Sequence, residues 1–358
     1  MDGESPDELE YEVVVVGGGP AGLSAALYST RLGHSTALVD RGGGRAAMIG
    51  DVHNVVGVTE DVSGNEFLET GRQQLEDYGC DVHRDFVTSA EQVAGEDGDE
   101  VDKRDLRFRL SGTNAHYLAE RVVLAMGFSD LRPDPPLPRT GKGLHYCLHC
   151  DAHVFVDRSV YVMGHEESAA HVAALMLNFT DQVDLLTRGH EPEWSAESAA
   201  MLANHPIDVI ESEVTGVHNG EDGWLEALEF EDGTVREYRG GFAMYGAEYN
   251  NGLAEALGCD IDDDGSVEVD EHNRTSVDGV YAVGDLTPGH NQVPIAMGDG
   301  AKAGISIHFD LRDFPRDPAL VEAAGPVRCE EVPGMPDELL EQAVAFHTYE
   351  DVEASGDD

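Results

Sequence analysis

Positive charge is scarce in this sequence. Among 358 residues, 22 are Lys or Arg and 71 are Asp or Glu, so the formal net charge is −49. Self-repulsion of this size destabilises a compact state unless salt screens it, and in about 1 M salt the Debye length falls to about 3 Å. We therefore expect adaptation to a salt-saturated cytoplasm, with an acidic interaction protein as the alternative. The sequence contains no basic patch that could neutralise the phosphates of a nucleic acid, so we expect no nucleic-acid partner.

Long apolar runs are also missing. No run approaches the roughly 18 residues that a transmembrane helix needs, so we expect no membrane partner. Residues 1–10 are acidic and lack the basic and apolar regions of a signal peptide, which predicts a cytoplasmic protein. Hydrophobic residues still make up 41% of the chain, enough to bury the cores of two or three domains.

Cysteine is sparse, and its five residues are too few for a disulfide scaffold in a chain of this length. Cys80, Cys259 and Cys329 stand alone, whereas Cys147 and Cys150 form a C-x-x-C. In a cytoplasmic protein, such a pair indicates redox or metal chemistry.

The segment 147–151 reads Cys-Leu-His-Cys-Asp and supports two interpretations. A redox pair can close a disulfide at a helix start, where the helix N-terminus lowers the pKa of a thiol. His149 then either supplies a further positive charge or is a polar loop residue, and Asp151 can carry a proton to a departing thiolate. A metal site would draw on His145, Cys147, His149, Cys150 and His153. No C-x-x-C or H-x-x-x-H outside this short loop supplies further ligands, so we favour the redox interpretation.

A strand–turn–helix precedes this motif. Residues 11–16 form a continuous apolar run, typical of a strand buried on both faces, and residues 35–39 form a second strand. Between them, a glycine-rich loop opens an Ala/Leu-rich helix that ends near residue 32. This is one βαβ half-unit.

The loop matches G-x-G-x-x-G through Gly17, Gly19 and Gly22. The first glycine allows the tight turn, the second lets a pyrophosphate approach the backbone, and the third lets helix and strand pack closely. The helix N-terminus then faces the phosphates, and Asp40, at the end of the next strand, can accept ribose hydroxyls. The pattern predicts a dinucleotide site.

A second such unit follows the C-x-x-C, with a strand at 159–163, a helix at 167–178 and a strand at 183–187. Further elements are expected at 63–79 (helix), 101–120 (hairpin), 121–125, 240–246 and 280–283 (strands) and 293–310 (helix). Residues 131–143 are rich in Pro and Gly and mark a domain boundary. A tail begins near residue 313 and includes an amphipathic stretch at 336–347.

Several further motifs carry a resemblance to a known family. They are Gly43-Gly44-Arg45, Asn54 before Val55-Val56-Gly57, Ala125-Met126-Gly127, the segment 145–151, the segment 275–285 ending in Gly284-Asp285, and Asn291-Gln292. Together with the first glycine loop, they resemble the low-molecular-weight thioredoxin reductase family over about residues 11–312. The composition makes this chain similar to a haloarchaeal-type member.

The resemblance implies an α/β fold with two Rossmann-like (three-layer ββα) nucleotide-binding domains. The expected divisions are the first part of an FAD-binding domain at 1–130, a central NAD(P)-like domain at 131–246, the second part of the FAD-binding domain at 247–312 and an acidic tail at 313–358. It also implies a homodimer that acts on a thioredoxin-like protein.

The resemblance further assigns residues to roles. FAD would be held by Gly17, Gly19, Pro20, Ala21, Gly22, Asp40, Arg41, Arg45, Asn54, Val87, Gly127, Gly284, Asp285, Gln292 and Val293. The catalytic residues would be Cys147, Cys150, Asp151 and His149. Cys150 would be the cysteine nearer the flavin, Cys147 would attack the substrate disulfide, and Asp151 would act as acid and base.

The second glycine loop departs from the family pattern. The family reads G-G-G-D-S-A, whereas residues 164–169 read Gly-His-Glu-Glu-Ser-Ala, and Glu166 replaces the glycine that lets a pyrophosphate approach. Of the three arginines that grip the 2′-phosphate, only Arg188 remains. We therefore expect that NADPH is not used in the usual manner; salt adaptation that reshaped a working loop is the alternative.

Three functions fit these features. The first is an FAD-dependent disulfide reductase whose donor is a ferredoxin or another reduced carrier. The second is a dithiol oxidase, in which dithiols reduce the flavin and oxygen reoxidises it. The third is a non-catalytic flavoprotein redox sensor.

Overall fold

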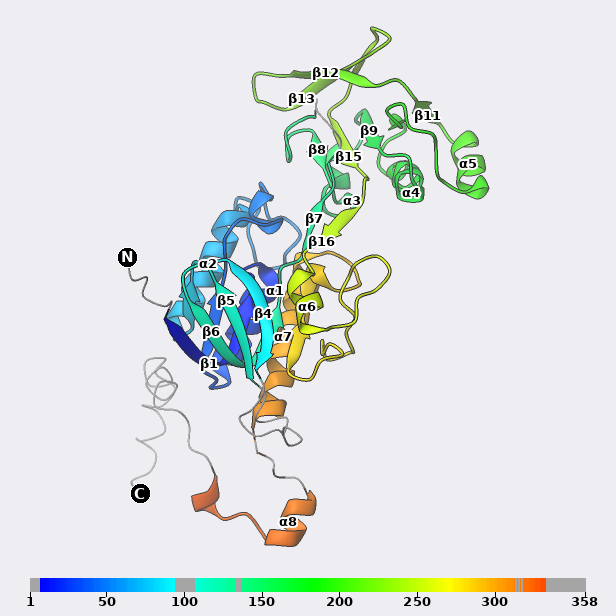
Figure 1. Ribbon diagram of the computed structural model, residues 1–358. Helices are drawn as coiled ribbons and strands as arrows, with labels where there is room; N and C mark the ends of the chain where they lie inside the picture. The colour runs from blue at the N-terminus through cyan, green and yellow to red at the C-terminus, as the bar shows by residue number, and fades with distance from the viewer. Residues whose placement is uncertain are drawn as a thin grey trace, which may run out of the picture. The chain divides into compact units, whose positions relative to one another are not determined.

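The computed structural model describes residues 7–93, 107–132, 137–312, 314, 316 and 318–332. Within these residues the chain forms two compact units (Figure 1). Unit 2 comprises Met48–Val62 and Ser129–Glu248, and unit 1 comprises the remainder. The predicted boundaries place residues 48–62 with the first nucleotide domain, whereas their contacts place them with the unit that carries the C-x-x-C. The amphipathic stretch predicted at 336–347 and the start of the hairpin predicted at 101–120 lie outside the described residues.

Unit 1 is built on one mixed sheet. Its strands, in spatial order, are β3 (Asp81–His83), β2 (Thr36–Val39), β1 (Glu8–Val16), β6 (His116–Leu124), β5 (Arg107–Gly112) and β4 (Val87–Val93), and β17 (Val280–Ala282) also pairs with β6. The ladders among β3, β2, β1, β6 and β17 are parallel, and β5 and β4 continue antiparallel. Val16 and Ala282 both pair with Leu124, so the carboxyl ends of β1, β6 and β17 meet at one edge.

The helices of unit 1 include α1 (Pro20–Arg31), α2 (Gly64–Asp77), α6 (Gly252–Leu257), α7 (Val293–Leu311) and α8 (Pro318–Ala324). Helices α1 and α7 pack closely because α7 presents two glycines to its neighbour. A Cβ on Gly300 would lie 2.0 Å from the carbonyl oxygen of Ala21, and one on Gly304 would lie 2.7 Å from Cβ of Tyr28. Helix α7 therefore brings the second half of unit 1 against the first glycine loop's helix.

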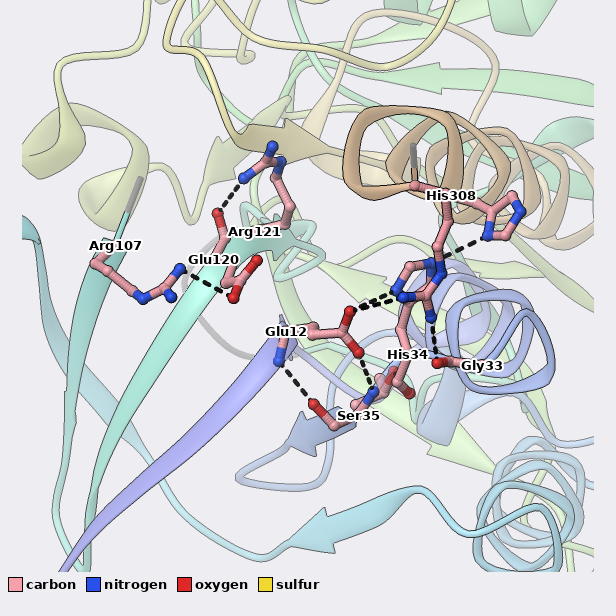
Figure 2. A network of polar contacts seen from close by, with 10 residues as sticks. Glu12, Gly33, His34, Ser35, Arg107, Glu120, Arg121 and His308 are labelled. Atoms are coloured by element: carbon pink, nitrogen blue, oxygen red, sulfur yellow. Dashed lines mark hydrogen bonds and ion pairs between the residues drawn. The ribbon is translucent and has the colours of Figure 1, made fainter. Parts of the chain in front are cut away.

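A polar network joins the start of unit 1 to the end of α7 (Figure 2). Buried His34 contacts Glu12 Oε1 through Nδ1 at 3.2 Å and His308 Nδ1 through Nε2 at 3.2 Å. Arg312, just after α7, pairs with the same Glu12 oxygen at 3.4 Å. Burial opposes ionisation of Glu12, but hydrogen bonds from His34 and the Ser35 N–H outweigh it and lower the pKa of Glu12.

Unit 2 contains a wholly parallel sheet and a small antiparallel one. The parallel order is β11 (Ile207–Ile210), β10 (Val183–Leu186), β9 (Val160–Met163), β15 (Gly240–Ala243) and β8 (Leu144–His145). Helices α4 (Glu167–Met176) and α5 (Ala196–Ala203) belong to it, and β12 (Val214–Asn219), β13 (Leu225–Phe230) and β14 (Val235–Glu237) form the antiparallel sheet. Strands β7 (Phe128–Asp130) and β16 (Ala247–Tyr249) pair where the chain passes between the units.

The predicted fold class is confirmed, since each unit has parallel strands connected through helices in the Rossmann manner. Strands β4, β7, β11 to β14 and β16 and helices α5 and α6 are not among the predicted elements. Within the described residues, no helix is long and apolar enough to cross a membrane.

Candidate active site

The first glycine loop joins β1 to α1 and leaves space for a ligand. Gly17 has a φ of +107°, and a Cβ there would lie 2.4 Å from the carbonyl oxygen of Ala125. A Cβ on Gly22 would lie 1.9 Å from the carbonyl oxygen of Gly17. Around Gly19, the N-cap of α1, an added Cβ would meet no atom within 4 Å. Gly17 and Gly22 are therefore needed because a side chain at either position would clash with the backbone. Gly19 leaves an open approach to the helix N-terminus.

Asp40 is tied directly to this loop. The N–H of Gly18 donates to Asp40 Oδ1 at 3.1 Å, and Arg72 Nη2 lies 3.7 Å from Oδ2. The side chain of Asp40 is only 13% exposed, so it is held in one place beside the glycines. A fixed carboxylate in this position fits a ribose that offers two hydroxyls.

A second group of predicted residues lies where β6 and β17 end. Arg45 Nη1 lies 3.6 Å from Asp285 Oδ2, and its guanidinium lies 4.9 Å from the ring centre of Phe128. Gly127 has a φ of +57°, and its Cβ would lie 3.5 Å from Cβ of Asp285. A hollow here is lined by Gly284, Asp285, Thr287, Pro288, Gly289, His290, Asn291, Ile295, Ala296 and Asp299.

The remaining predicted FAD residues divide between the units. Pro20 and Ala21 begin α1, Gln292 is the N-cap of α7, and Val293 is its first residue. Arg41 lies over the ring of Phe86 at 5.5 Å, and Val87 is buried at the start of β4. Asn54 belongs to unit 2. The open loop, the fixed carboxylate and the helix N-terminus of unit 1 fit a dinucleotide such as FAD.

In unit 2, Cys147 and Cys150 form a disulfide. Strand β8 ends at His145, two residues before Cys147, which is the N-cap of the short helix α3 (Leu148–Asp151). The N–H of Cys150 points at Cys147 Sγ at 3.1 Å. The pair is thus joined across a single helical turn, as a reversible redox disulfide requires.

Asp151 lies between two imidazoles. Its Oδ2 is 2.8 Å from Nδ1 of His145, and its Oδ1 is 3.6 Å from Nε2 of His53. The His53 Nε2 is also 3.2 Å from the carbonyl oxygen of Cys150. His149 is exposed on the same turn, and no hydrogen bond or ion pair joins it to Asp151 in the described part of the chain.

Comparison with known proteins agrees with this geometry. The family model described as pyridine nucleotide-disulphide oxidoreductase matches residues 11–300. The chain belongs to this family. The thioredoxin reductase of Peptoclostridium litorale is 30% identical over 322 residues, which cover 83% of this chain and 96% of that protein.

Solved structures agree as well. The thioredoxin reductase of Streptococcus pyogenes MGAS5005 superposes with a TM-score of 0.74 at 27% identity, covering 85% of this chain and 99% of that one. The structure of HlmI gives a TM-score of 0.77 at 29% identity, covering 87% and 96%. The predicted resemblance is confirmed: this is an FAD-type disulfide oxidoreductase of the thioredoxin reductase family.

The family's second nucleotide loop, between β9 and α4, contains acidic side chains in this chain. Glu166 is the N-cap of α4, makes no side-chain capping bond and is exposed. The next residue, Glu167, accepts hydrogen bonds from the hydroxyl groups of Ser195 and Ser198 and from the Ser195 N–H, which lower the pKa of Glu167. A carboxylate therefore stands where phosphate would meet the helix N-terminus.

The one arginine left from the family's 2′-phosphate motif is already engaged. Arg188 has a φ of +53°, and its side chain is only 8% exposed. Its Nε lies 3.2 Å from Oε2 of Glu213, which neutralises it locally. Beside it, the rings of His165 and His190 stack with centres 4.6 Å apart. The guanidinium of Arg188 is therefore already engaged by a carboxylate.

The metal interpretation loses its thiolates when Cys147 and Cys150 are bonded to each other. In the residues that the structure describes, no group of three His, Cys, Asp or Glu side chains could hold a metal ion. Of the lone cysteines, Cys80 and Cys259 are buried and Cys329 is exposed. Burial raises the pKa of Cys80 to about 11 and also raises that of Cys259, so neither is a thiolate at neutral pH.

Sequence reasoning did not find His53 as a functional residue, and it considered His145 only as a metal ligand. His53 lies 98 positions before Asp151, and no motif in the sequence links the two. Only the folding of residues 48–62 against unit 2 brings them together.

Proposed function

We propose that this protein exchanges electrons between FAD and the disulfide of a thioredoxin-like protein through Cys147 and Cys150, and that its electrons do not come from NADPH in the usual way. The disulfide of unit 2 supports the first half of the proposal. FAD, when bound, supplies a two-electron carrier. The chain's own residues form the glycine loop and Asp40 that bind it, and the dithiol that reaches the substrate.

The acidic second loop supports the other half. Glu166 places a carboxylate at the N-terminus of α4, and Arg188 is buried against Glu213. An anionic pyrophosphate would meet like charge without a free arginine to offset it. We therefore propose a ferredoxin or another reduced carrier as the donor.

An anaerobic titration of the flavin tests both halves. In molar KCl, stoichiometric NADPH should leave the visible absorbance band of the oxidised flavin unchanged. Photoreduced ferredoxin should bleach this band. Oxidised thioredoxin added to the reduced enzyme should restore the band, since its disulfide takes up the two electrons. Rapid bleaching by NADPH would show that the proposal for the donor is wrong. Bleaching by dithiols with fast recovery in oxygen would show that the enzyme runs as a dithiol oxidase. Exchange with thiols without catalytic turnover would indicate a redox sensor.

The working environment follows from the charge. A net charge of −49 suits a salt-saturated cytoplasm, and we propose a homodimer there, as the resemblance implies. Light scattering across a KCl series would test this: a dimer is expected in molar salt, with dissociation or unfolding on dilution.

A further inference from the structure

Asp151 is the only carboxylate next to the redox pair in sequence, and both of its oxygens face an imidazole. His145 contacts Oδ2 at 2.8 Å and His53 faces Oδ1 at 3.6 Å. Within the described residues, these two histidines are its only ion-pair partners. The two contacts come from different places, since His145 lies on β8 and His53 lies in the segment 48–62.

His145 is a fixed donor. The residue is 7% exposed, and aromatic rings surround it: Phe155 at 5.1 Å, Phe242 at 6.1 Å and Trp224 stacked at 6.2 Å. Its Nε2 is buried and has no hydrogen-bond partner in the part of the chain that the structure describes. Oδ2 accepts whether Asp151 is ionised or carries its proton on Oδ1, so Nδ1 carries the proton of the 2.8 Å bond. With nothing at Nε2 to receive a proton, the ring orients Asp151 but cannot pass protons onward.

His53 differs in access. Its side chain is 22% exposed, and its Nε2 lies within reach of both Asp151 and the carbonyl oxygen of Cys150. The other titratable group against it is His153, an exposed histidine whose ring meets the His53 ring edge-to-face at 4.9 Å. His53 thus gives Asp151, whose own side chain is 23% exposed, a titratable neighbour that reaches solvent.

Building on the function proposed above, we infer that His53, Asp151 and the sulfurs form a proton path, with His145 as the positioning residue. Opening the Cys147–Cys150 bond takes two electrons, which reduced FAD would supply when bound, and turns one S–S bond into two thiolates, one of which stays ionised. The Asp151 carboxyl gives its proton to the departing thiolate and becomes a carboxylate. Protonated His53 then returns a proton to Asp151 and regains one from solvent. When the disulfide closes, each transfer runs in reverse.

The reverse direction gives a test that needs no knowledge of the natural donor. Dithiothreitol is mixed anaerobically with the FAD-loaded full chain in molar KCl, and flavin bleaching is followed by stopped flow. The variants are His53→Gln, which keeps a nitrogen near the Nε2 position, and His145→Asn, which keeps one near Nδ1. The matched control is His218→Gln, because His218 pairs with Glu229 at 3.4 Å in the same unit, and its side chain is 52% exposed.

The two histidines should respond differently. His53→Gln should slow bleaching about tenfold. His53→Ala should slow it at least as much, and added imidazole should restore the rate of the Ala variant, since that variant vacates a position that reaches solvent. His145→Asn should also slow it, but imidazole should not help, because that position is enclosed. In an Asp151→Asn background, His53→Gln should add no further loss, as expected for residues that act in series. His218→Gln should match the wild type.

The outcomes separate the inference from the function on which it rests. If the wild type does not bleach, the dithiol–flavin exchange itself is wrong. If the wild type bleaches and His53→Gln is equally fast, or if His53→Ala is slowed without rescue by imidazole, the proton path is overturned. Should His145→Asn lose its FAD through misfolding, the imidazole result with His53→Ala decides alone.

Discussion

The two glycine loops of this molecule occupy equivalent places in their units, and they differ most at the position that faces a ligand. Each follows a buried strand, and each begins with a glycine at positive φ, +107° at Gly17 and +151° at Gly164. A Cβ on either would lie close to a backbone carbonyl oxygen, at 2.4 Å from Ala125 or 2.6 Å from Met244. The turn itself is therefore retained in both units.

The difference lies at the N-cap of the helix that follows. Gly19 caps α1 with open space around it, whereas Glu166 caps α4 with an exposed carboxylate. The first glycine, which the turn needs, is kept in both loops. The second is Gly19 in one loop and Glu166 in the other, and Ala169 replaces the third. A Rossmann unit can thus keep its backbone while its ligand chemistry changes.

The largest effect is expected from filling the first loop. Gly22→Ala places a Cβ 1.9 Å from the carbonyl oxygen of Gly17, so helix α1 must move away from β1. We expect a loss of about 3 kcal/mol or more in the free energy of unfolding, and loss of bound FAD. Thermal unfolding and the flavin content of the purified protein measure both. A variant that retains full FAD content would show that this loop is not the flavin site.

The next effect should be confined to unit 2. Cys150→Ser leaves no disulfide to reduce, so turnover of thioredoxin should fall by about 10³-fold or more. Flavin content should stay unchanged, because the cysteine lies in the other unit from the first glycine loop. Turnover is measured with dithionite-reduced enzyme and oxidised thioredoxin. Unchanged turnover would remove the dithiol from the mechanism.

A smaller effect should follow from restoring the second loop towards the first. Glu166→Gly removes charge and bulk at the N-cap of α4, and we expect NADPH to bleach the flavin about tenfold faster, since an exposed charge contributes on the order of 1 kcal/mol. Glu166→Gln separates charge from bulk. Glu197→Gln, in the first turn of α5, is the control and should leave the rate unchanged. Equal rates in all variants would show that Glu166 is not what excludes NADPH.

The smallest effect concerns acid stability, and it belongs to unit 1 alone. Burial, together with His34 and Arg312, lowers the pKa of His308 below its ordinary 6.5. The unfolded chain then binds this proton first, so stability is fully present above about pH 6.5 and declines as the pH falls. Glu12, whose pKa is lowered, adds a further loss at more acid pH.

His308→Gln should remove the first part of this decline. As the pH is lowered from 7.5 to about 5.5, the melting temperature of the wild type should fall by a few degrees more than that of the variant. Differential scanning fluorimetry in molar KCl measures it, with His218→Gln as the exposed control. A difference that does not change with pH would contradict the role given to His308.

Much of this fold could be predicted because its central strands are unambiguous. The run at 11–16, the glycine turn and the following helix correspond to β1 and α1, and the predicted helix at 293–310 ends one residue before the end of α7. Such buried parallel strands read as continuous apolar runs. The antiparallel strands β12 to β14 could not be predicted in this way, because exposed acidic residues interrupt their apolar residues, as in Leu225–Phe230.

The site could be predicted only as far as its motifs extend. The disulfide, Asp151 and the glycine loop are each contiguous in sequence. The contacts of Asp151 with His53 and His145, and the pairing of Arg188 with Glu213, depend on tertiary packing that no spacing encodes. The roles of individual FAD residues remain predictions until a complex is measured.

The burial of two cysteines has a practical consequence for thiol chemistry. Cys80 and Cys259 have raised pKa values and are enclosed, so a thiol-specific reagent should not modify them in the native protein. Only exposed Cys329 then reacts while the Cys147–Cys150 bond is closed, and three cysteines react once it opens. Counting adducts by mass spectrometry would report the oxidation state of the enzyme directly, even inside cells, without a spectroscopic probe.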